Sequence, residues 1–235
     1  MEYEPKSIHT YFNSDLLDIY ACDVDIRITE FPESADRNWL YYFGLTINFT
    51  LPNEWSHGGF QWSGTHEFKD SGNKGVNWGG NSNQTGCGGI NNEPCAWECH
   101  TWYHYLVRRV DDENDQQKYH RWLFTIRDYD TGEEIEYGTV RTKSPNIVCR
   151  NTMVFTETGY GVRCDSPKVR VEWRNPNFST PAGRFSPKRI VANYNGTCVN
   201  PKNTNQNLLS DSPLYWFHET NTTRITPPNT VLWPI

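Results

Sequence analysis

The sequence predicts an all-β fold, an antiparallel β-sandwich with long Gly/Asn-rich loops and an irregular C-terminal tail. Apolar and polar side chains alternate over short runs, which is the pattern of a strand with one buried face. The 17 glycines and 14 prolines interrupt the 235-residue chain throughout. No amphipathic run with helix caps reaches about 12 residues. Many short strands separated by turns are typical of a sandwich or a barrel.

The alternation locates the elements in order along the chain. We expect an N-terminal segment at 1–18, with a helical turn near 13–18 capped by Ser14, followed by a sandwich core at 19–174. Residues 148–155 and 161–164 are expected to form a hairpin around a turn at 156–160. The other alternating runs of the core are 24–29, 40–50, 102–107, 122–126 and 168–173.

Three regions break the strand pattern. Residues 71–92 hold seven Gly and six Asn around Trp78, which predicts a long structured loop. Residues 111–118 are charged and predict the tip of a hairpin. Residues 175–235 are rich in Pro, Asn and Thr, so we expect an irregular C-terminal extension packed on the same domain.

Composition and charge exclude several classes of protein. Aromatic residues make up 14% of the chain, enough buried area to argue against disorder. The 28 acidic and 22 basic residues give a net charge of −6, which argues against nucleic acid as a partner. No run approaches the roughly 18 apolar residues of a membrane helix, so no membrane span is expected.

Cysteines and glycosylation motifs together favour a secreted, extracellular protein. The chain has seven cysteines and five Asn-x-Ser/Thr sites. It begins Met1-Glu2-Tyr3 without a basic and then apolar leader, so secretion implies a signal peptide that has been cleaved. The expected glycosylation sites are Asn48, Asn83, Asn177, Asn195 and Asn221.

The spacing of the cysteines suggests three disulfides. A bridge between Cys149 and Cys164 would close the open end of the hairpin at 148–164. Cys95 and Cys99, with Cys87 nearby, would supply a bridge within one loop, and a bridge between Cys22 and Cys198 would join the two ends of the chain. Seven is an odd number, so one cysteine is free, modified or paired with another chain. The last case gives a disulfide-linked oligomer, and a non-covalent oligomer is the alternative.

A family resemblance follows from the order of these strands. Residues 102–107, a polar loop, 121–128 and a turn at Thr131-Gly132 resemble the core meander of laminin-G-like and concanavalin A-like jelly rolls. The segments 42–45 and 58–62 resemble further strands of that jelly-roll domain, and of an uncharacterised family of secreted proteins that shares its fold. The resemblance covers roughly residues 20–175. It implies a glycan-handling fold without fixing an activity.

The stretch from Trp55 to Asn81 carries the strongest functional signal. A sugar site needs a flat aromatic ring for the C–H face and amides or carboxylates for the hydroxyls, and Trp78 is the expected platform. The alternative is that these aromatics fill the core and that Asn and Gly serve turn geometry. The predicted ligand-binding residues are Trp55, His57, Gln61, Asp70, Asn77, Trp78 and Asn81.

Two segments invite a metal interpretation. Cys95, Cys99, His100 and His104 have zinc-like spacing, but residues four apart on a strand lie roughly 13 Å apart, so a disulfide is favoured over zinc. Calcium is the one cofactor that remains possible, at Asp128 and Asp130, although an acidic hairpin turn also explains them.

The lead hypothesis is a secreted lectin-like module that binds a carbohydrate or a glycoprotein. One alternative is a glycoside hydrolase or lyase on the same fold, with Glu134 and Glu136 as its carboxylate pair, because residues two apart on a strand share a face. A hydrolytic triad that uses His57, His66 or His120 also stays open. The other alternative is a structural or adhesive extracellular subunit.

Overall fold

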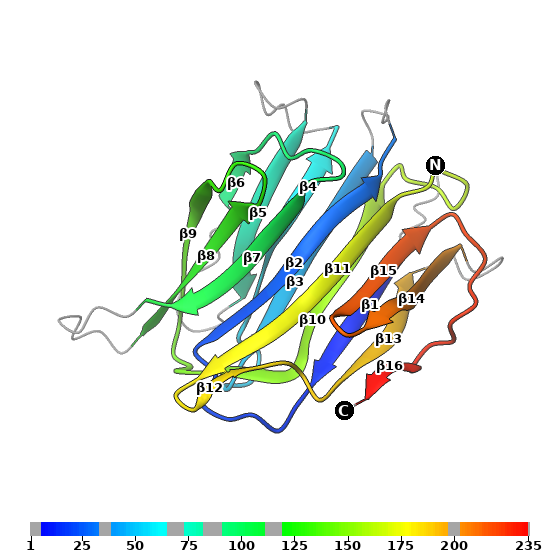
Figure 1. Cartoon of the computed structure of the whole chain (residues 1–235). Helices are drawn as coiled ribbons and strands as arrows, with labels where there is room; N and C mark the ends of the chain where they lie inside the picture. Colours follow the sequence, from blue (N-terminus) through cyan, green and yellow to red (C-terminus); the bar gives the residue numbers. More distant parts are fainter. Residues whose placement is uncertain are drawn as a thin grey trace.

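The computed structural model describes residues 6–32, 39–64, 73–81, 91–110, 119–196 and 203–234. In these ranges every regular element is a strand, and all strand pairings are antiparallel. The strands form two sheets that pack face to face (Figure 1). The prediction of an all-β sandwich is confirmed. No helix in the described ranges has the length and apolar character that a membrane crossing needs.

The two sheets have similar widths and are called sheet A and sheet B below. In spatial order, sheet A contains β16 (Val231–Pro234), β13 (Arg189–Gly196), β1 (Lys6–Asn13), β10 (Ile147–Tyr160), β3 (Trp39–Phe49), β4 (Trp55–Ser63), β5 (Lys74–Asn81) and β6 (Asn91–Pro94). Sheet B contains β14 (Thr204–Asp211), β15 (Leu214–Thr220), β11 (Arg170–Thr180), β2 (Ala21–Glu30), β7 (Trp102–Arg109), β8 (His120–Asp128) and β9 (Glu134–Thr142), with β12 (Gly183–Phe185) paired to β11.

Both ends of the chain are more regular than expected. The segment expected at 1–18 contributes β1, which lies inside sheet A between β10 and β13. The described part of 175–235 supplies β13 and β16 to sheet A and β14 and β15 to sheet B. The helical turn expected near 13–18 is wrong, because residues 14–17 adopt no regular structure. These polar strands escape pattern recognition because each contributes only a few apolar side chains to the core.

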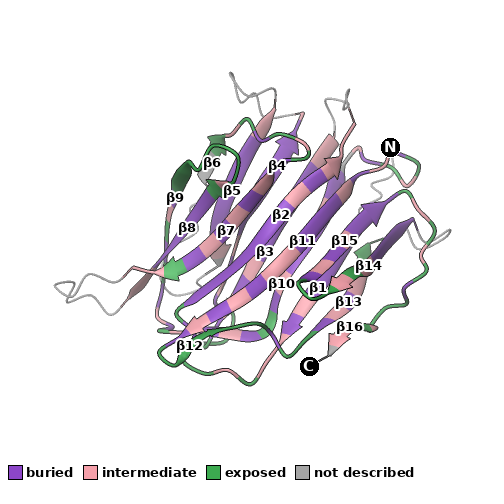
Figure 2. Ribbon diagram, in the orientation of Figure 1, coloured by how far each residue is buried: buried purple, intermediate pink, exposed green. Residues whose placement is uncertain are grey.

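The core lies between the sheets and is dominated by aromatic side chains. Figure 2 shows buried residues along the strands of both sheets and exposed residues in the turns and on the edge strand β9. The alternation of the sequence is confirmed, since Val24, Ile26 and Ile28 are buried while Arg27 and Thr29 are not. The fully buried tryptophans are Trp78, Trp97, Trp122, Trp173 and Trp216.

Trp78 belongs to this core, so its predicted role as a ligand platform is wrong. Residues 74–81 form strand β5, not a loop, and their alternation directs Trp78 inward. Its ring stacks on Phe124 of the opposite sheet, with 5.1 Å between ring centroids. Gly58 makes room for it, because a Cβ there would lie 2.6 Å from Trp78 Cε3. Trp97 also belongs to the core and is 1% exposed.

A buried polar network ties the inner faces of the two sheets together. Thr10 of β1 donates its hydroxyl to Gln206 Oε1 (2.6 Å), and its Oγ1 lies 2.7 Å from His218 Nε2. His218 Nδ1 lies 3.0 Å from Thr156 Oγ1 of β10, and Trp216 Nε1 donates to Thr10 Oγ1 (3.0 Å). All five side chains are fully buried. Burial, followed by the charge of His9, holds the pKa of His218 well below its usual value.

The predicted disulfides are wrong where the structure describes both partners. Cys149 is a free, buried thiol and Cys95 and Cys99 are also free, so neither the 149–164 nor the 95–99 bridge forms. Cys22 is free and Cys198 lies outside the described residues. Cys164 is disulfide-bonded, but to none of these four free thiols. Burial raises the pKa of Cys149 to about 12, consistent with an inert core thiol.

The packing of Trp78 yields a stability prediction. Trp78→Ala removes a fully buried ring and should lower the free energy of unfolding by about 3–5 kcal/mol. Trp55→Ala is the matched control, since Trp55 lies half-buried on the same sheet and should cost much less. Urea unfolding followed by circular dichroism measures both. Equal, small losses for the two variants would contradict the core position of Trp78.

Candidate functional site

One row of polar side chains crosses the outer face of sheet A, the face directed away from sheet B. Ser7 of β1 lies opposite Glu157 of β10, Glu157 lies opposite Tyr42 of β3, and Tyr42 lies opposite Gln61 of β4. Directly opposed residues of antiparallel strands point to the same face. The flanking residues Ile8, Thr156, Phe43 and Phe60 are buried in the core. We call Ser7, Glu157, Tyr42 and Gln61 the Glu157 row.

A hydrogen-bond network from β1 surrounds the Glu157 carboxylate. Ser7 donates its hydroxyl to Glu157 Oε1 (3.1 Å), and His9 Nε2 lies 3.4 Å from the same oxygen. Ser7 Oγ and His9 Nε2 are 2.6 Å apart. Tyr11 Oη lies 3.4 Å from the other ring nitrogen of His9, Nδ1. Tyr11 and Glu157 therefore contact opposite ring nitrogens of His9, which fixes the orientation of the ring.

These neighbours keep Glu157 ionised. Burial favours the neutral carboxyl and raises its pKa, but the hydrogen bonds and charge of His9, with the Ser7 hydrogen bond and the charge of His57, outweigh burial, so the pKa of Glu157 is lower than usual. The Glu157 side chain is 45% exposed, whereas that of His9 is 9% exposed. The Glu157 carboxylate is therefore accessible to solvent, while His9, which holds it in place, is largely buried.

Aromatic rings border the row on one side. Tyr42 and Phe155 make an edge-to-face contact at 4.8 Å, and His57 lies 5.4 Å from Tyr42 and 5.0 Å from Trp55. Burial lowers the pKa of His57 more than the charge of Glu157 raises it, so the net shift is downward. Phe155 covers Gly44 of β3, where a Cβ would lie 2.4 Å from Phe155 Cζ.

Four predicted ligand-binding residues meet on this face. Trp55, His57 and Gln61 occupy alternate positions of β4, and Asn77 of β5 accepts a hydrogen bond from Tyr42 Oη (3.3 Å). The structure does not bring Trp78 to them, since it lies in the core. Asp70 lies outside the described residues. Asn81 is opposite Trp55 in the register of β4 and β5.

Sequence reasoning missed Ser7, His9 and Glu157. The expected turn at 156–160 is wrong, because β10 continues through Tyr160 and pairs with β1 and β3. The sequence around Glu157 shows no clear alternation, because Phe155 on the outer face is apolar and Thr156 and Thr158, which are buried, are polar. The 150 residues between Ser7 and Glu157 hide their contact from any local pattern.

A cavity of about 610 Å³ lies on the same face, next to the Glu157 row. Tyr11 joins the two, because it contacts His9 and also lines the cavity. The cavity is lined by Tyr11, Asn13, Thr46, Asn48, Arg150, Asn151, Met153, Val191 and Asn193.

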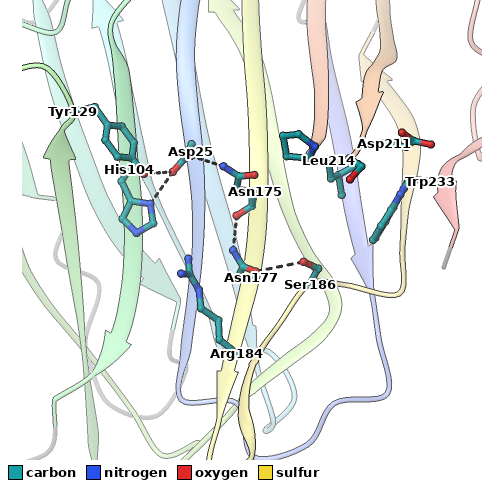
Figure 3. Close-up of a pocket in the computed structure, with 12 residues that line it drawn as sticks. Asp25, His104, Tyr129, Asn175, Asn177, Arg184, Ser186, Asp211, Leu214 and Trp233 are labelled. Atoms are coloured by element: carbon teal, nitrogen blue, oxygen red, sulfur yellow. Dashed lines mark hydrogen bonds and ion pairs between the residues drawn. The ribbon is translucent and has the colours of Figure 1, made fainter.

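A second pocket, of about 450 Å³, opens on the outer face of sheet B (Figure 3). At its base the buried carboxylate of Asp25 accepts four hydrogen bonds: from His104 Nδ1 (2.8 Å), Tyr129 Oη, Arg174 Nε and Asn175 Nδ2 (3.0 Å each). These donors come from β7, β11 and the turn after β8. With four donors already in place, Asp25 acts as a structural cross-link and is poorly suited to activate a water molecule.

The two buried aspartates beside this second pocket, Asp25 and Asp23, have pKa values that are shifted in opposite directions. Burial by itself raises the pKa of Asp25. The hydrogen bonds from His104, Asn175 and Arg174 lower it by a larger amount, so the net shift is downward. The pKa of Asp23 is raised, because burial outweighs its contacts with Arg184 and His104.

The remaining predicted carboxylates lie apart from both pockets. Glu134 and Glu136 are exposed on the edge strand β9, where Glu136 is 3.9 Å from Arg108. Asp128 Oδ1 accepts the backbone N–H groups of Asp130 (2.7 Å) and Thr131 (3.0 Å), as in an acidic turn. In the described residues no three His, Cys, Asp or Glu side chains are grouped to hold a metal ion.

The network around Glu157 predicts a pKa change that needs no substrate. His9→Gln removes the main favourable contact of the carboxylate, so the pKa of Glu157 should rise. Carbon-13 NMR titration of the glutamate carboxyls measures it, with His120→Gln on β8 of the other sheet as the control. An unchanged Glu157 titration in His9→Gln would show that His9 does not support the carboxylate.

The Asp25 network predicts a pH-dependent loss of stability. Asp25→Asn should lower the free energy of unfolding by about 3 kcal/mol at neutral pH, because the half-buried Arg174 loses its counter-charge and the other donors lose a charged acceptor. Since the folded-state pKa of Asp25 is lowered, its contribution is present above the unfolded pKa and is lost as pH falls through the folded pKa.

Urea unfolding at several pH values should therefore show the wild type and Asp25→Asn converging in acid. The control is Asp15→Asn, whose carboxylate is 88% exposed and should contribute little. A pH-independent gap between wild type and Asp25→Asn would contradict the assignment.

No family model and no curated protein matches this sequence. Similarity appears at the level of the fold. A crystal structure of Scytalido-glutamic peptidase with a peptide-based transition-state analogue is similar, with a TM-score of 0.51 and 11% identity, over 92% of this chain and 97% of that chain. A structure of SCP-B, a member of the eqolisin family of peptidases, in complex with the tripeptide Ala-Ile-His has a TM-score of 0.46 and 11% identity, over 93% and 98%.

These comparisons correct the lectin hypothesis. The Scytalido-glutamic peptidase that shares this fold is a peptidase and not a carbohydrate-binding protein, so the comparison does not support a carbohydrate or glycoprotein partner. The buried position of Trp78 removes the platform on which that hypothesis depended. The specific likeness to concanavalin A-like jelly rolls is not confirmed. At 11% identity the comparison establishes what this chain shares with the Scytalido-glutamic peptidase: a two-sheet β-sandwich.

Proposed function

We propose that this protein is a peptide hydrolase whose catalytic carboxylate is Glu157. The observation that carries the proposal is the Glu157 row, which combines a supported, accessible carboxylate with an amide side chain on one face of a rigid sheet. The fold likeness to a peptidase that is named for a glutamate supports the same choice. Among the alternatives predicted from the sequence, the carboxylate-dependent glycoside hydrolase is the nearest to this proposal. The proposal differs from it in the catalytic carboxylate, Glu157, and in the substrate, a peptide.

Peptide hydrolysis needs a base for water and a hydrogen-bond donor for the carbonyl oxygen. In this proposal Glu157 removes a proton from a water molecule, and the water oxygen forms a bond to the carbonyl carbon. Glu157 then gives that proton to the amide nitrogen as the C–N bond breaks. The lowered pKa of Glu157 keeps it in the basic form into the acid range.

Gln61 is the proposed donor to the negative charge that develops on the carbonyl oxygen. Tyr42 separates Gln61 from Glu157, so their Cα atoms lie two strand spacings, or roughly 10 Å, apart. The two side chains lie on the same face, and in this proposal the peptide group and the water molecule bind over Tyr42, between them. Gln61 is only 6% exposed, and a largely buried donor is already oriented.

We also propose that the protein works outside the cell. The disulfide at Cys164 and the five glycosylation motifs support this location. Asn195 and Asn221 are exposed, whereas the amide of Asn177 donates to the backbone oxygen of Asn175 (2.7 Å). Intact mass measurement of the natural protein would count the occupied sites.

Substitution of Glu157 tests the proposal. Glu157→Gln should reduce kcat/KM on a mixed peptide library by roughly 10²–10⁴-fold, since general-base catalysis is lost. Gln61→Ala should reduce kcat by roughly 10²–10³-fold, in line with other oxyanion donors. Mass spectrometry of the cleaved peptides between pH 3 and pH 7 measures both.

Glu134→Gln is the matched control, because it makes the same chemical change at an exposed glutamate of β9. Full activity is expected for this control. Absence of peptide cleavage by the wild-type protein, or full activity in Glu157→Gln with the fold intact by circular dichroism, would overturn the proposal.

A further inference from the structure

The cavity beside the Glu157 row has a polar lining without a carboxylate. Tyr11, Met153 and Thr46 lie opposite one another on β1, β10 and β3, in the same alternation as the Glu157 row. The other neutral lining residues are Asn13, Asn48, Asn151, Asn193 and Val191. The only charged side chain among the lining residues is Arg150.

A bulge in β10 places Arg150 at this cavity. The register of β10 against β3 shifts between Val148 and Met153, and Asn151 has a positive φ of 69°. Asn48 Nδ2 donates to the Asn151 carbonyl (2.7 Å), and Thr152 Oγ1 donates to the Val148 carbonyl (2.8 Å). The bulge is therefore held by specific hydrogen bonds and does not depend on Arg150.

The guanidinium of Arg150 has no partner among the described residues. Arg150 is exposed, and no hydrogen bond or ion pair joins it to them. This contrasts with Arg27, Arg170 and Arg174 on sheet B, each of which contacts a carboxylate. At the same end of sheet A, Arg189 lies opposite Asn13. The nearby Asp15 is paired with Lys188 at 2.7 Å.

This lining matches an anionic side chain. A guanidinium binds a carboxylate through two parallel hydrogen bonds, and the amides of Asn13 and Asn151 and the hydroxyl of Thr46 add neutral donors. A lysine or arginine side chain would meet the Arg150 charge with no carboxylate among the lining residues to offset it. Charge complementarity thus favours aspartate or glutamate as the occupant.

The cavity is placed to receive a side chain of the bound substrate. Met153 precedes Glu157 by four residues on β10, so the cavity lies roughly 13 Å from the proposed catalytic carboxylate. An extended peptide along the strand advances roughly 3.4 Å per residue. The side chain that enters the cavity therefore belongs to a residue about four positions from the cleaved bond.

We propose that this hydrolase selects peptides with an acidic residue about four positions from the cleaved bond, through Arg150 and the cavity that it lines. The proposal rests on the function proposed above and adds a substrate class to it.

The test uses a cleavable parent peptide with Glu, Gln or Lys at each of positions three to five on both sides of the bond. At the matching position, wild-type kcat/KM should be about five- to tenfold higher for Glu than for Gln, as expected of one accessible charge pair. The preference should shrink at high salt. Arg150→Gln should lose it, and Arg150→Glu should prefer Lys over Glu.

Arg163→Glu is the control for a change of net charge, since Arg163 is 65% exposed and pairs with Asp165 away from the cavity. This control should keep the preference for Glu. Equal rates for Glu, Gln and Lys peptides in the wild type, or the same preference in Arg150→Glu, would overturn the substrate class alone. Failure of the wild type to cleave any peptide of the set would instead overturn the proposed function.

Discussion

The buried hydrogen bonds between Thr10, His218 and Thr156 are the constraint on which the site depends. They join β1 and β10 of sheet A to β15 of sheet B, so they fix which residues of β1 and β10 face inward. Strand side chains alternate with a period of two, and a slip by one residue would exchange the two faces. Glu157 and His9 would then enter the core, where an ionised carboxylate is very costly. The buried network thus determines which residues of β1 and β10 lie on the outer face.

The two outer faces of the sandwich differ in how their charges are used. On sheet B, the carboxylates of Asp25 and Glu172 are saturated by arginines and other donors, and they join neighbouring strands. On sheet A, Glu157 keeps nearly half of its side chain exposed, and Arg150 has no partner among the described residues. Paired charges cross-link strands, while charges left open to solvent can bind something else.

Much of the fold follows from the sequence, and less of the site does. The alternation of Val24, Ile26 and Ile28 predicted an inner face correctly, because each strand has its own local signal. Trp78 was misassigned because its Gly- and Asn-rich surroundings are typical of loops, whereas Gly58 on the next strand admits its ring. Gln61 and His57 were identified by residue type. Glu157 was not, since its partners come from a strand 150 residues away.

The central position of β1 also sets an order of assembly. Strand β1, at residues 6–13, is far in sequence from both of its partners, since it pairs with β10 at 147–160 and with β13 at 189–196. Ribosomes add residues one at a time, so β1 has no complete set of neighbours until β13 has emerged. Pairings of such long range are intrinsically slow. The carboxylate site therefore needs two strands that the ribosome adds about 150 residues apart, and it cannot form before the second of them is made.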